Sequence, residues 1–341
     1  MTDAPALEVV DLVKQFPSKR GQVVHAVDGV SFTLGRGEML GLVGESGSGK
    51  STVANCVLRL TEPTAGTIKL NGTDITHLSR RAMRPLRRDL HMVFQDPYSS
   101  LNPRMTCGDI VGEPVRLHGL ARGRALDVRV DKMFDAVGLR GELRFRYPHE
   151  LSGGQRQRVG LARALILEPS VLIADEPVSA LDVSVQAAIL NLLRDLQRDM
   201  RFSCLFITHD LATVEFLCDR VAVMYLGEIV ETAPRAELFE RPQHPYTQAL
   251  LSAALVPDPA VQRTRRHVVL EGDPPSPLDP PSGCRFHTRC PLHSESAPQS
   301  DEENPELREF APGHLVACHL VARDRPAPRL VENAADMVSQ A

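Results

Sequence analysis

The feature that most limits what this chain can fold into is a glycine-rich stretch at residues 44–51. It reads Gly-Glu-Ser-Gly-Ser-Gly-Lys-Ser and matches the phosphate-loop pattern G-x-x-x-x-G-K-S/T. An apolar run, residues 39–43, precedes it, and a helical pattern follows it. Glycines let successive backbone N–H groups point at phosphate oxygens, and the following helix offers the positive end of its dipole. The residues predicted to hold nucleotide phosphates are Gly44, Glu45, Ser46, Gly47, Ser48, Gly49, Lys50, Ser51 and Thr52.

Short apolar runs predict an α/β fold with a mainly parallel sheet. Runs that are apolar throughout fit strands buried on both faces, and helical patterns such as residues 155–167 and 185–198 separate them. The opening segment, residues 7–34, instead alternates apolar and polar residues around glycine turns, which favours antiparallel strands. Ligands on parallel sheets bind beyond the carboxyl ends of the strands. The four runs span residues 39–43, 91–94, 171–174 and 204–208.

Two adjacent acids follow the third apolar run and are candidates for hydrolytic chemistry. In phosphate-loop enzymes an aspartate at this place holds the Mg²⁺ shell together with the loop hydroxyl, here Asp175 with Ser51. Glu176 is then placed to orient or deprotonate an attacking water. We expect Lys50 to reach the β- and γ-phosphates. Adjacent acids alone commonly cap a helix, so this prediction depends on the phosphate loop.

Composition argues against several other classes of protein. A net charge of −4 disfavours a protein that coats nucleic acid or an anionic membrane, and basic pairs such as Arg80-Arg81 fit a solvated helix face. The N-terminus lacks a basic segment followed by an apolar run, and no stretch of about 18 apolar residues occurs. We therefore expect neither a secretory signal nor a membrane span. The odd number of cysteines, seven, disfavours a disulfide framework.

A second glycine-rich motif, residues 151–155, narrows the choice to one family. Its sequence Leu-Ser-Gly-Gly-Gln opens a helical pattern and predicts a second, smaller anion cradle. This string resembles the LSGGQ signature of ABC ATPases. The resemblance implies a head-to-tail dimer in which the phosphate loop of one subunit and the signature of the other clamp one ATP. It assigns ATP contacts to Ser152, Gly153, Gly154 and Gln155.

The other motifs of that family follow in the expected order. Phe16 lies where the family has an aromatic residue that stacks on adenine. Gln95 resembles the Q-loop glutamine, which meets Mg²⁺ and water and senses the membrane partner, and residues 179–182 resemble the D-loop at the dimer interface. His209 resembles the switch histidine, which contacts the γ-phosphate. The resemblance covers residues 6–320 and implies the ABC ATPase fold: a parallel sheet core, an antiparallel β subdomain and a helical signature subdomain.

Several strings resemble the oligopeptide/dipeptide permease branch, and the region after Gln95 is most similar to its F-type ATPases. This implies a heterodimer with a paralogous D-type ATPase, two transmembrane permease subunits and, indirectly, an extracytoplasmic substrate-binding protein. The chain would lie peripherally at the cytoplasmic face of the inner membrane, without nucleic acid as a partner. Related systems carry nickel complexes, glutathione or oligosaccharides, so the cargo stays open. The strings are residues 26–32, 44–52, 94–104 and 244–247.

Two other classes of ABC protein compete with a transporter subunit. Repair and chromosome-organising members insert long coiled coils between the two cradles, and this chain has no sustained heptads there. A regulatory cassette would be expected to have lost Lys50, Glu176 or His209, and all three are present.

The chain divides into three predicted regions. Residues 6–250 form the ATPase domain, with the helical subdomain at about 96–165, and residues 251–322 form a C-terminal extension. Five prolines within residues 273–281 predict an extended connector inside that extension. The last residues, 323–341, are expected to be a loosely held tail.

Three late cysteines, Cys284, Cys290 and Cys318, resemble part of a four-cysteine set that can ligate a 4Fe–4S cluster in this branch. The usual third cysteine would fall seven residues after Cys290, where this chain has Ala297. The alternatives are a cluster, a zinc site or three free thiols. A cluster would be structural, because it would stabilise a segment too short to build its own core. A fourth ligand could come from His287, His293, His314 or His319.

Overall fold

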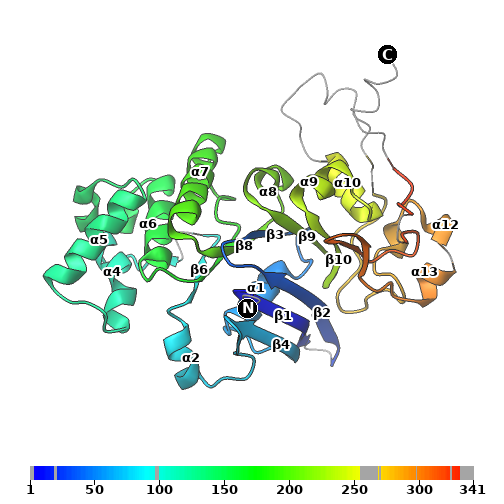
Figure 1. Ribbon diagram of the computed structural model, residues 1–341, viewed down its shortest axis with the longest axis horizontal. Coiled ribbons are helices and arrows are strands. Elements are labelled where there is room, and N and C mark those ends of the chain that lie inside the picture. The colour runs from blue at the N-terminus through cyan, green and yellow to red at the C-terminus, as the bar shows by residue number, and fades with distance from the viewer. Residues whose placement is uncertain are drawn as a thin grey trace, which may run out of the picture.

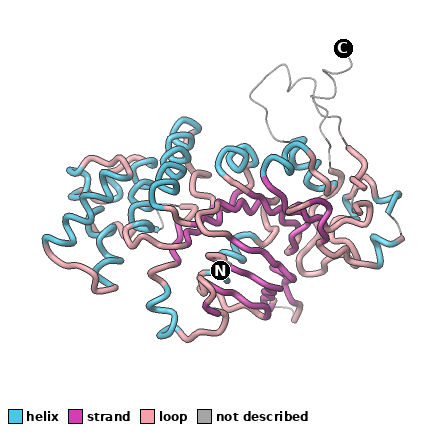
Figure 2. The backbone as a smooth tube through the Cα atoms, viewed as in Figure 1, coloured by secondary structure: helices cyan, strands magenta, loops and turns pink. Residues whose placement is uncertain are grey.

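The described strands form two sheets that pack against one shared hydrophobic core. The computed structural model describes residues 4–18, 21–96, 100–253, 268, 270–296, 298–322 and 325–330. Within these residues one sheet has four strands and the other has eight. Figure 1 shows the larger sheet running through the middle, with helices at one end and the C-terminal extension at the other. Figure 2 shows the same division between helical and strand-rich parts.

Five neighbouring parallel strands make up most of the larger sheet and run to one of its edges. Every residue of β3, β7 and β8 is buried, which explains why these runs are apolar throughout. The predicted parallel strands are confirmed, with bounds one residue different at β6, β7 and β8, and β9 adds a fifth strand that the patterning did not identify. In spatial order they are β9 (Arg220–Tyr225), β3 (Met39–Val43), β8 (Ser203–Thr208), β7 (Val171–Asp175) and β6 (Leu90–Val93).

Alternate residues of these strands face two different hydrophobic cores. On β7, Val171 and Ile173 pack into a core shared with the antiparallel sheet and helix α1 (Lys50–Val57). Their neighbours Leu172 and Ala174 pack into a second core, shared with most of the helices. Because side chains alternate across a strand, the sheet is covered on both faces.

The smaller sheet is antiparallel throughout and confirms the interpretation of the opening segment. Leu7 of strand β1 (Leu7–Pro17) pairs with Leu34 of strand β2 (Val23–Leu34), and both side chains are buried. Its strands, in spatial order, are β2 (Val23–Leu34), β1 (Leu7–Pro17), β4 (Ala65–Leu70) and β5 (Thr73–Asp74).

Among the described residues, three helices form the helical end of the molecule, and they lie within the span predicted for the helical subdomain (Figure 1). They are α4 (Cys107–Leu117), α5 (Arg124–Ala136) and α6 (Gly153–Leu165), and two short 3-10 turns, Gly141–Phe145 and Pro148–Glu150, join α5 to α6. Among the described residues, no helix is long and apolar enough to cross a bilayer. The helices that connect or flank the central strands are α2 (Arg80–Leu86), α7 (Val183–Met200), α8 (Leu211–Leu217), α9 (Arg235–Glu240) and α10 (Pro245–Ala253).

The C-terminal extension adds strands to the central sheet. Strand β10 (Glu228–Pro234), still within the ATPase region, pairs with β9. In the extension, β12 (His314–Val316) pairs with β10, and β11 (Arg308–Ala311) pairs with β12, all antiparallel. The extension therefore continues the sheet of the ATPase region. Its described part also carries the short helical segments η3 (His287–Arg289), α12 (His293–Ser296) and α13 (Gln299–Glu302).

Part of the predicted tail is ordered against α10. The Leu330 N–H donates to Gln248 Oε1 at 2.8 Å, and the buried Ala327 donates to Gln243 Oε1 at 3.2 Å. The rest of the tail, residues 323–324 and 331–341, lies outside the described residues, as do residues 254–267 at the predicted start of the extension.

A buried carboxylate fastens the extension to the sheet. Glu231 on β10 is fully buried and accepts hydrogen bonds from the backbone N–H groups of Gln243 and His244, at 2.7 and 2.9 Å. His314 on β12 lies with Nε2 2.7 Å from the same carboxylate. A carboxylate only accepts, so this nitrogen carries the proton. One side chain thus joins β10, the segment before α10 and β12.

We expect Glu231→Gln to destabilise the protein by about 2 kcal/mol, because the amide turns two donor protons toward groups that are themselves donors. The control is Glu302→Gln on α13, the same change at an exposed carboxylate, which should stay within about 0.5 kcal/mol. Thermal and denaturant unfolding followed by circular dichroism measure both. Equal shifts for the two variants would contradict the role of Glu231.

Candidate functional site

The phosphate loop lies between β3 and α1, as its motif requires. At two of its glycines, close contacts leave no room for a side chain. A Cβ on Gly44 would lie 2.1 Å from the carbonyl oxygen of Met224, and one on Gly49 would lie 2.2 Å from that of Ala26. Gly49 also caps α1 with a φ of 105°, in the region that favours glycine. No other residue fits these positions without moving the backbone, so the loop geometry follows directly from the sequence.

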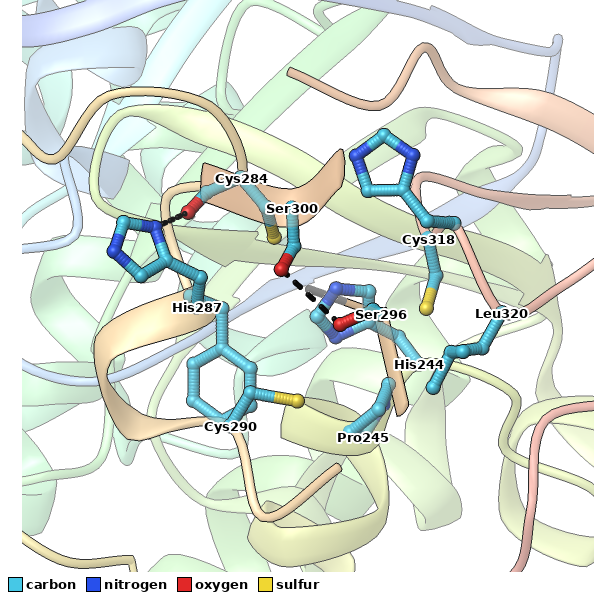
Figure 3. Close-up of a pocket in the computed structure, with 11 residues that line it drawn as sticks. His244, Pro245, Cys284, His287, Cys290, Ser296, Ser300, Cys318 and Leu320 are labelled. Carbon is cyan, nitrogen blue, oxygen red and sulfur yellow. Dashed lines mark hydrogen bonds between the residues drawn. The ribbon is translucent and has the colours of Figure 1, made fainter. Parts of the chain in front are cut away.

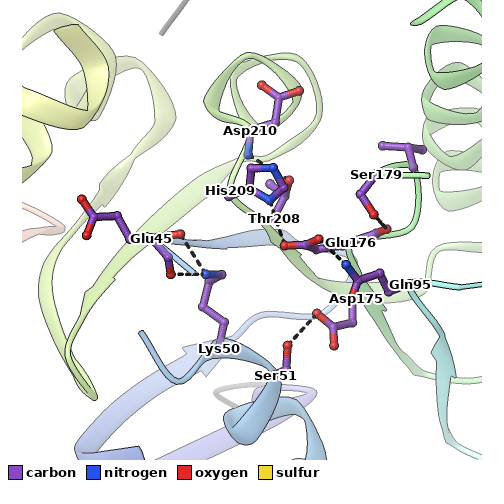
Figure 4. Close-up of polar contacts among 12 residues, drawn as sticks. Glu45, Lys50, Ser51, Gln95, Asp175, Glu176, Ser179, Thr208, His209 and Asp210 are labelled. Atoms are coloured by element: carbon purple, nitrogen blue, oxygen red, sulfur yellow. Dashed lines mark hydrogen bonds and ion pairs between the residues drawn. The ribbon is translucent and has the colours of Figure 1, made fainter. Parts of the chain in front are cut away.

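Lys50 is the buried cation of the loop. Its ammonium donates to the carbonyl oxygens of Gly44 and Glu45, both at 2.8 Å, and contacts Ser48 Oγ at 3.3 Å (Figure 4). Burial lowers the pKa of Lys50, and the negative charges of Glu176, Asp175 and Glu45 oppose that shift. The three donors of the ammonium are thus held on oxygen atoms inside the loop.

Asp175 ends β7 beside the start of α1. Ser51 donates from Oγ to Asp175 Oδ1 at 3.2 Å (Figure 4). Burial raises the pKa of Asp175, the hydrogen bond from Ser51 lowers it, and the charge of Glu176 raises it further. A hydroxyl and a carboxylate in contact are oxygen ligands of the kind that Mg²⁺ prefers.

Glu176 is the centre of a three-residue contact that joins the ends of three strands. Gln95 follows β6 and donates from Nε2 to Glu176 Oε2 at 2.7 Å, while His209 follows β8 and has Nδ1 2.8 Å from Oε1 (Figure 4). Glu176 itself has a φ of 44°, a left-handed conformation that is costly for a residue with a side chain and that clusters at functional sites. The three candidate catalytic residues are therefore in direct contact.

The signature residues lie elsewhere in the chain's own structure, at the start of α6 in the helical end (Figure 1). Ser152 caps the helix: its Oγ accepts from the Gln155 N–H at 3.3 Å, and Gln155 Oε1 accepts from the Ser152 N–H at 3.0 Å. A Cβ on Gly154 would lie 2.6 Å from Val185 Cγ1, and one on Gly153 would lie 3.2 Å from Leu181. Close packing against the predicted D-loop and the start of α7 therefore favours glycine at both positions, and more strongly at Gly154.

Phe16 also lies apart from the catalytic contact. It is 37% exposed on β1, and the Lys14 ammonium lies 4.7 Å from the centroid of its ring. Its predicted contact with adenine stays a prediction.

Sequence reasoning missed two residues that hold the phosphate loop from the far end of the chain. Tyr246 Oη accepts from the Glu45 N–H at 2.9 Å, and Arg289 pairs with the Glu45 carboxylate at 3.0 Å. Tyr246 belongs to a string that served only to recognise the family branch, and Arg289 lies between residues considered only as metal ligands. No local pattern places them beside a loop about 200 residues earlier.

The three late cysteines come together in one pocket of the extension, with His287 and His319 also in its lining (Figure 3). Burial raises the pKa of all three thiols, to about 11 for Cys290 and about 12 for Cys318. Within the described residues, however, no group of three or more histidine, cysteine, aspartate or glutamate side chains could hold a metal ion.

The iron–sulfur and zinc expectations for Cys284, Cys290 and Cys318 are thus unsupported by the geometry. Of the four histidines considered as a fourth ligand, His293 instead contacts Asp301 at 2.6 Å and His314 contacts Glu231, and neither lines the pocket. Ala297, where the usual cysteine is absent, lies outside the described residues.

Comparison with known proteins yields two matching family models. The one described as ABC transporter matches residues 27–179, and the one described as oligopeptide/dipeptide transporter, C-terminal region, matches residues 230–296. The oligopeptide transport ATP-binding protein AppF of Bacillus subtilis is 50% identical over 321 residues, which cover 92% of this chain and 97% of AppF.

Two solved structures are similar in fold. A dimeric structure of the ATP-binding cassette MJ0796 bound to ADP and Pi is 28% identical with a TM-score of 0.62, and covers 67% of this chain and 98% of the cassette. The structure of cbiO1 from Clostridium perfringens, part of the ABC transporter complex cbiONQ, is 30% identical with a TM-score of 0.61, and covers 70% of this chain and 91% of cbiO1.

Proposed function

This chain belongs to the ABC transporter family, in its oligopeptide/dipeptide branch, and we propose that it binds and hydrolyses ATP to drive the import of peptides. The contact among Gln95, Glu176 and His209, next to Asp175 and the phosphate loop, carries the enzymatic part of this proposal. The similarity to AppF, a protein named for oligopeptide transport, supports the peptide cargo. A nickel complex, glutathione or an oligosaccharide would use the same ATPase chemistry.

The nucleotide would lie on the phosphate loop. Lys50 would leave the loop carbonyl oxygens and donate to the β- and γ-phosphates, which accept from an ammonium in the same way. Mg²⁺ would be held by Ser51, Asp175 and Gln95, whose oxygen atoms suit that ion. Phe16 would lie against adenine. The buried setting strengthens each of these charge interactions relative to water.

Hydrolysis would depend on Glu176. Gln95 and His209 each contact one of its carboxylate oxygens, so the carboxylate is held before a water arrives. From this position Glu176 can accept a proton from the attacking water, and His209 can turn to the γ-phosphate. The left-handed backbone of Glu176 is consistent with a functional role, because such a conformation persists only where the surrounding structure enforces it.

The complete site would need a second cassette. Ser152 caps a helix whose N-terminus is suited to an anion, yet it lies apart from the phosphate loop of its own chain. A head-to-tail dimer would bring Ser152, Gly153, Gly154 and Gln155 to the ATP of the partner, and the dimeric MJ0796 cassette supports that arrangement. The partner would be a paralogous D-type ATPase.

The remaining partners would place the chain at the membrane. Two permease subunits would dock near residues 95–104 at the cytoplasmic face, and an extracytoplasmic binding protein would deliver the cargo.

For the thiol pocket we propose the metal-free alternative. The three thiols are one ligand short of a full set, and no described histidine, aspartate or glutamate completes a metal-binding group with them. No step of the ATPase reaction involves this pocket.

We expect Glu176→Gln to lower steady-state ATP turnover by about 10²–10⁴-fold while ATP still binds, because the amide cannot accept the water's proton. It should also accumulate the closed dimer. Lys50→Ala should instead weaken nucleotide binding, which separates the two roles. Phosphate release and nucleotide affinity are measured on the assembled complex, and near-normal turnover of Glu176→Gln would disprove the assignment.

The purified chain alone is expected to hydrolyse ATP slowly, because each site lacks a signature from another chain. Adding the paralogous ATPase and two permease subunits should raise the rate. Activity per chain is measured across a dilution series. Full, cooperative activity from a dilute monomer would contradict the composite site.

Anaerobically purified protein is expected to be colourless and to contain no stoichiometric iron, sulfide or zinc. Elemental analysis and the visible absorption spectrum measure this, with Cys284→Ser as a comparison that should be equally stable if no metal is held. Iron and sulfide in a ratio typical of a cluster, lost in Cys284→Ser, would restore the 4Fe–4S alternative, and one zinc per chain would restore the zinc site.

A further inference from the structure

We propose that the C-terminal extension controls the affinity of the phosphate loop for nucleotide through Arg289, a positioning residue that holds and neutralises Glu45. Arg289 ends the short segment η3, and its guanidinium meets the carboxylate with two nitrogens, Nη1 at 3.0 Å from Oε2 and Nη2 at 3.5 Å from Oε1. The Arg289 side chain is only 8% exposed. This inference rests on the proposed binding of ATP at the loop and adds a determinant outside the ATPase motifs.

A second contact fixes the same loop residue by its backbone. Tyr246 on α10 is fully buried and accepts the Glu45 N–H at 2.9 Å. Its ring packs against those of Tyr225 and Phe286, at centroid distances of 4.6 and 5.4 Å. Phe286 lies three residues before Arg289, so this aromatic cluster supports both contacts to Glu45.

The contacts continue from Glu45 to the cation of the loop. The carbonyl oxygen of Glu45 accepts from the Lys50 ammonium at 2.8 Å and from the Ser48 N–H at 3.2 Å. The side chain, amide and carbonyl of Glu45 are therefore all engaged. Glu45 therefore links the extension to Lys50 through a single residue of the loop.

Charge gives the arrangement a consequence for ligand binding. Glu45 is an acid within a loop built for an anion, and its charge is felt at Lys50, where it helps to raise the lowered pKa. Without Arg289, an unpaired carboxylate would repel the phosphates and would be free to turn toward Lys50. Removing one partner of a largely buried pair leaves the other charge uncompensated. Arg289 is thus expected to strengthen ATP binding without contacting the nucleotide.

Arg285, which lies in the extension four residues before Arg289, provides a matched control. It also links the extension to the ATPase region by charge: its guanidinium forms ion pairs with Asp28 and with Glu228, the latter at 3.0 Å. Like that of Arg289, its side chain is largely buried, with 13% exposed. It makes no contact with Glu45. Arg285→Gln therefore loosens the attachment of the extension without changing the charge balance of the loop.

The test measures Mg-ATP affinity of the full chain by calorimetry for the wild type, Arg289→Gln, Arg285→Gln, Glu45→Gln and the double variant Glu45→Gln/Arg289→Gln. We expect Arg289→Gln to weaken ATP about tenfold, the size of coupling found between contacting charges. The double variant should regain most of the affinity, because the repelling carboxylate is gone. Arg285→Gln should keep wild-type affinity. In the assembled complex, Arg289→Gln should raise KM for ATP and leave kcat nearly unchanged.

Three results would overturn the proposal: wild-type affinity in Arg289→Gln, an equal loss in Arg285→Gln, or no recovery in the double variant. If Arg289→Gln does not fold, Arg289→Lys replaces it. That variant keeps the charge and loses the two-nitrogen contact, so it should lose only about threefold, and a loss as large as tenfold would count against neutralisation. Failure of the wild-type chain to bind Mg-ATP would instead reject the proposed function itself.

Discussion

Parallel pairing of the strands β3, β8, β7 and β6 brings the phosphate loop and the candidate catalytic residues together. The carboxyl ends of parallel strands meet at one edge of a sheet, so residues far apart in the sequence arrive at one place. Gln95, Glu176 and His209 each follow a different strand, yet they share one carboxylate contact. Both faces of these strands are covered by separate cores. A slip of one residue would exchange the two faces and move each of these groups, so the cores hold the register that the site requires.

Much of this edge could be predicted, because each strand end carries a local signal: an apolar run followed at once by polar residues. The loop at residues 44–51 adds glycines at positions where a side chain would collide with backbone. Where the local signal is weak, prediction failed. Strand β9 ends in a plain turn at Leu226-Gly227, and β12 has only three residues, too few to show a period. These two strands are part of the framework that attaches the extension to the sheet.

The contacts of Glu45 could not be predicted, for a different physical reason. Tyr246 and Arg289 follow it by 201 and 244 residues, and tertiary contacts such as the pairing of β10 with β12 bring the extension beside the loop. Propensity and periodicity describe neighbours in sequence, whereas these contacts depend on the finished sheet. The left-handed φ of Glu176 could not be predicted either, because an isolated glutamate would avoid it and its surroundings enforce it.

The packing of the extension on the ATPase region also bears on whether the late cysteines hold a metal. The cysteine-bearing segment, residues 283–322, is too short to build a stable core alone, which at first favours a metal as its source of stability. In the structure the segment uses the core of the ATPase region instead: Phe286 is 1% exposed within it, and Glu231 ties β12 to β10. Stability therefore gives no reason for a metal, and its presence depends on the ligands alone. Burial raises the pKa of Cys290 to about 11 and of Cys318 to about 12, so a metal would have to displace protons from enclosed thiols at neutral pH. That cost falls as the pH rises toward these values, and within the described residues no group of three or more histidine, cysteine, aspartate or glutamate side chains is arranged to offset it by holding an ion.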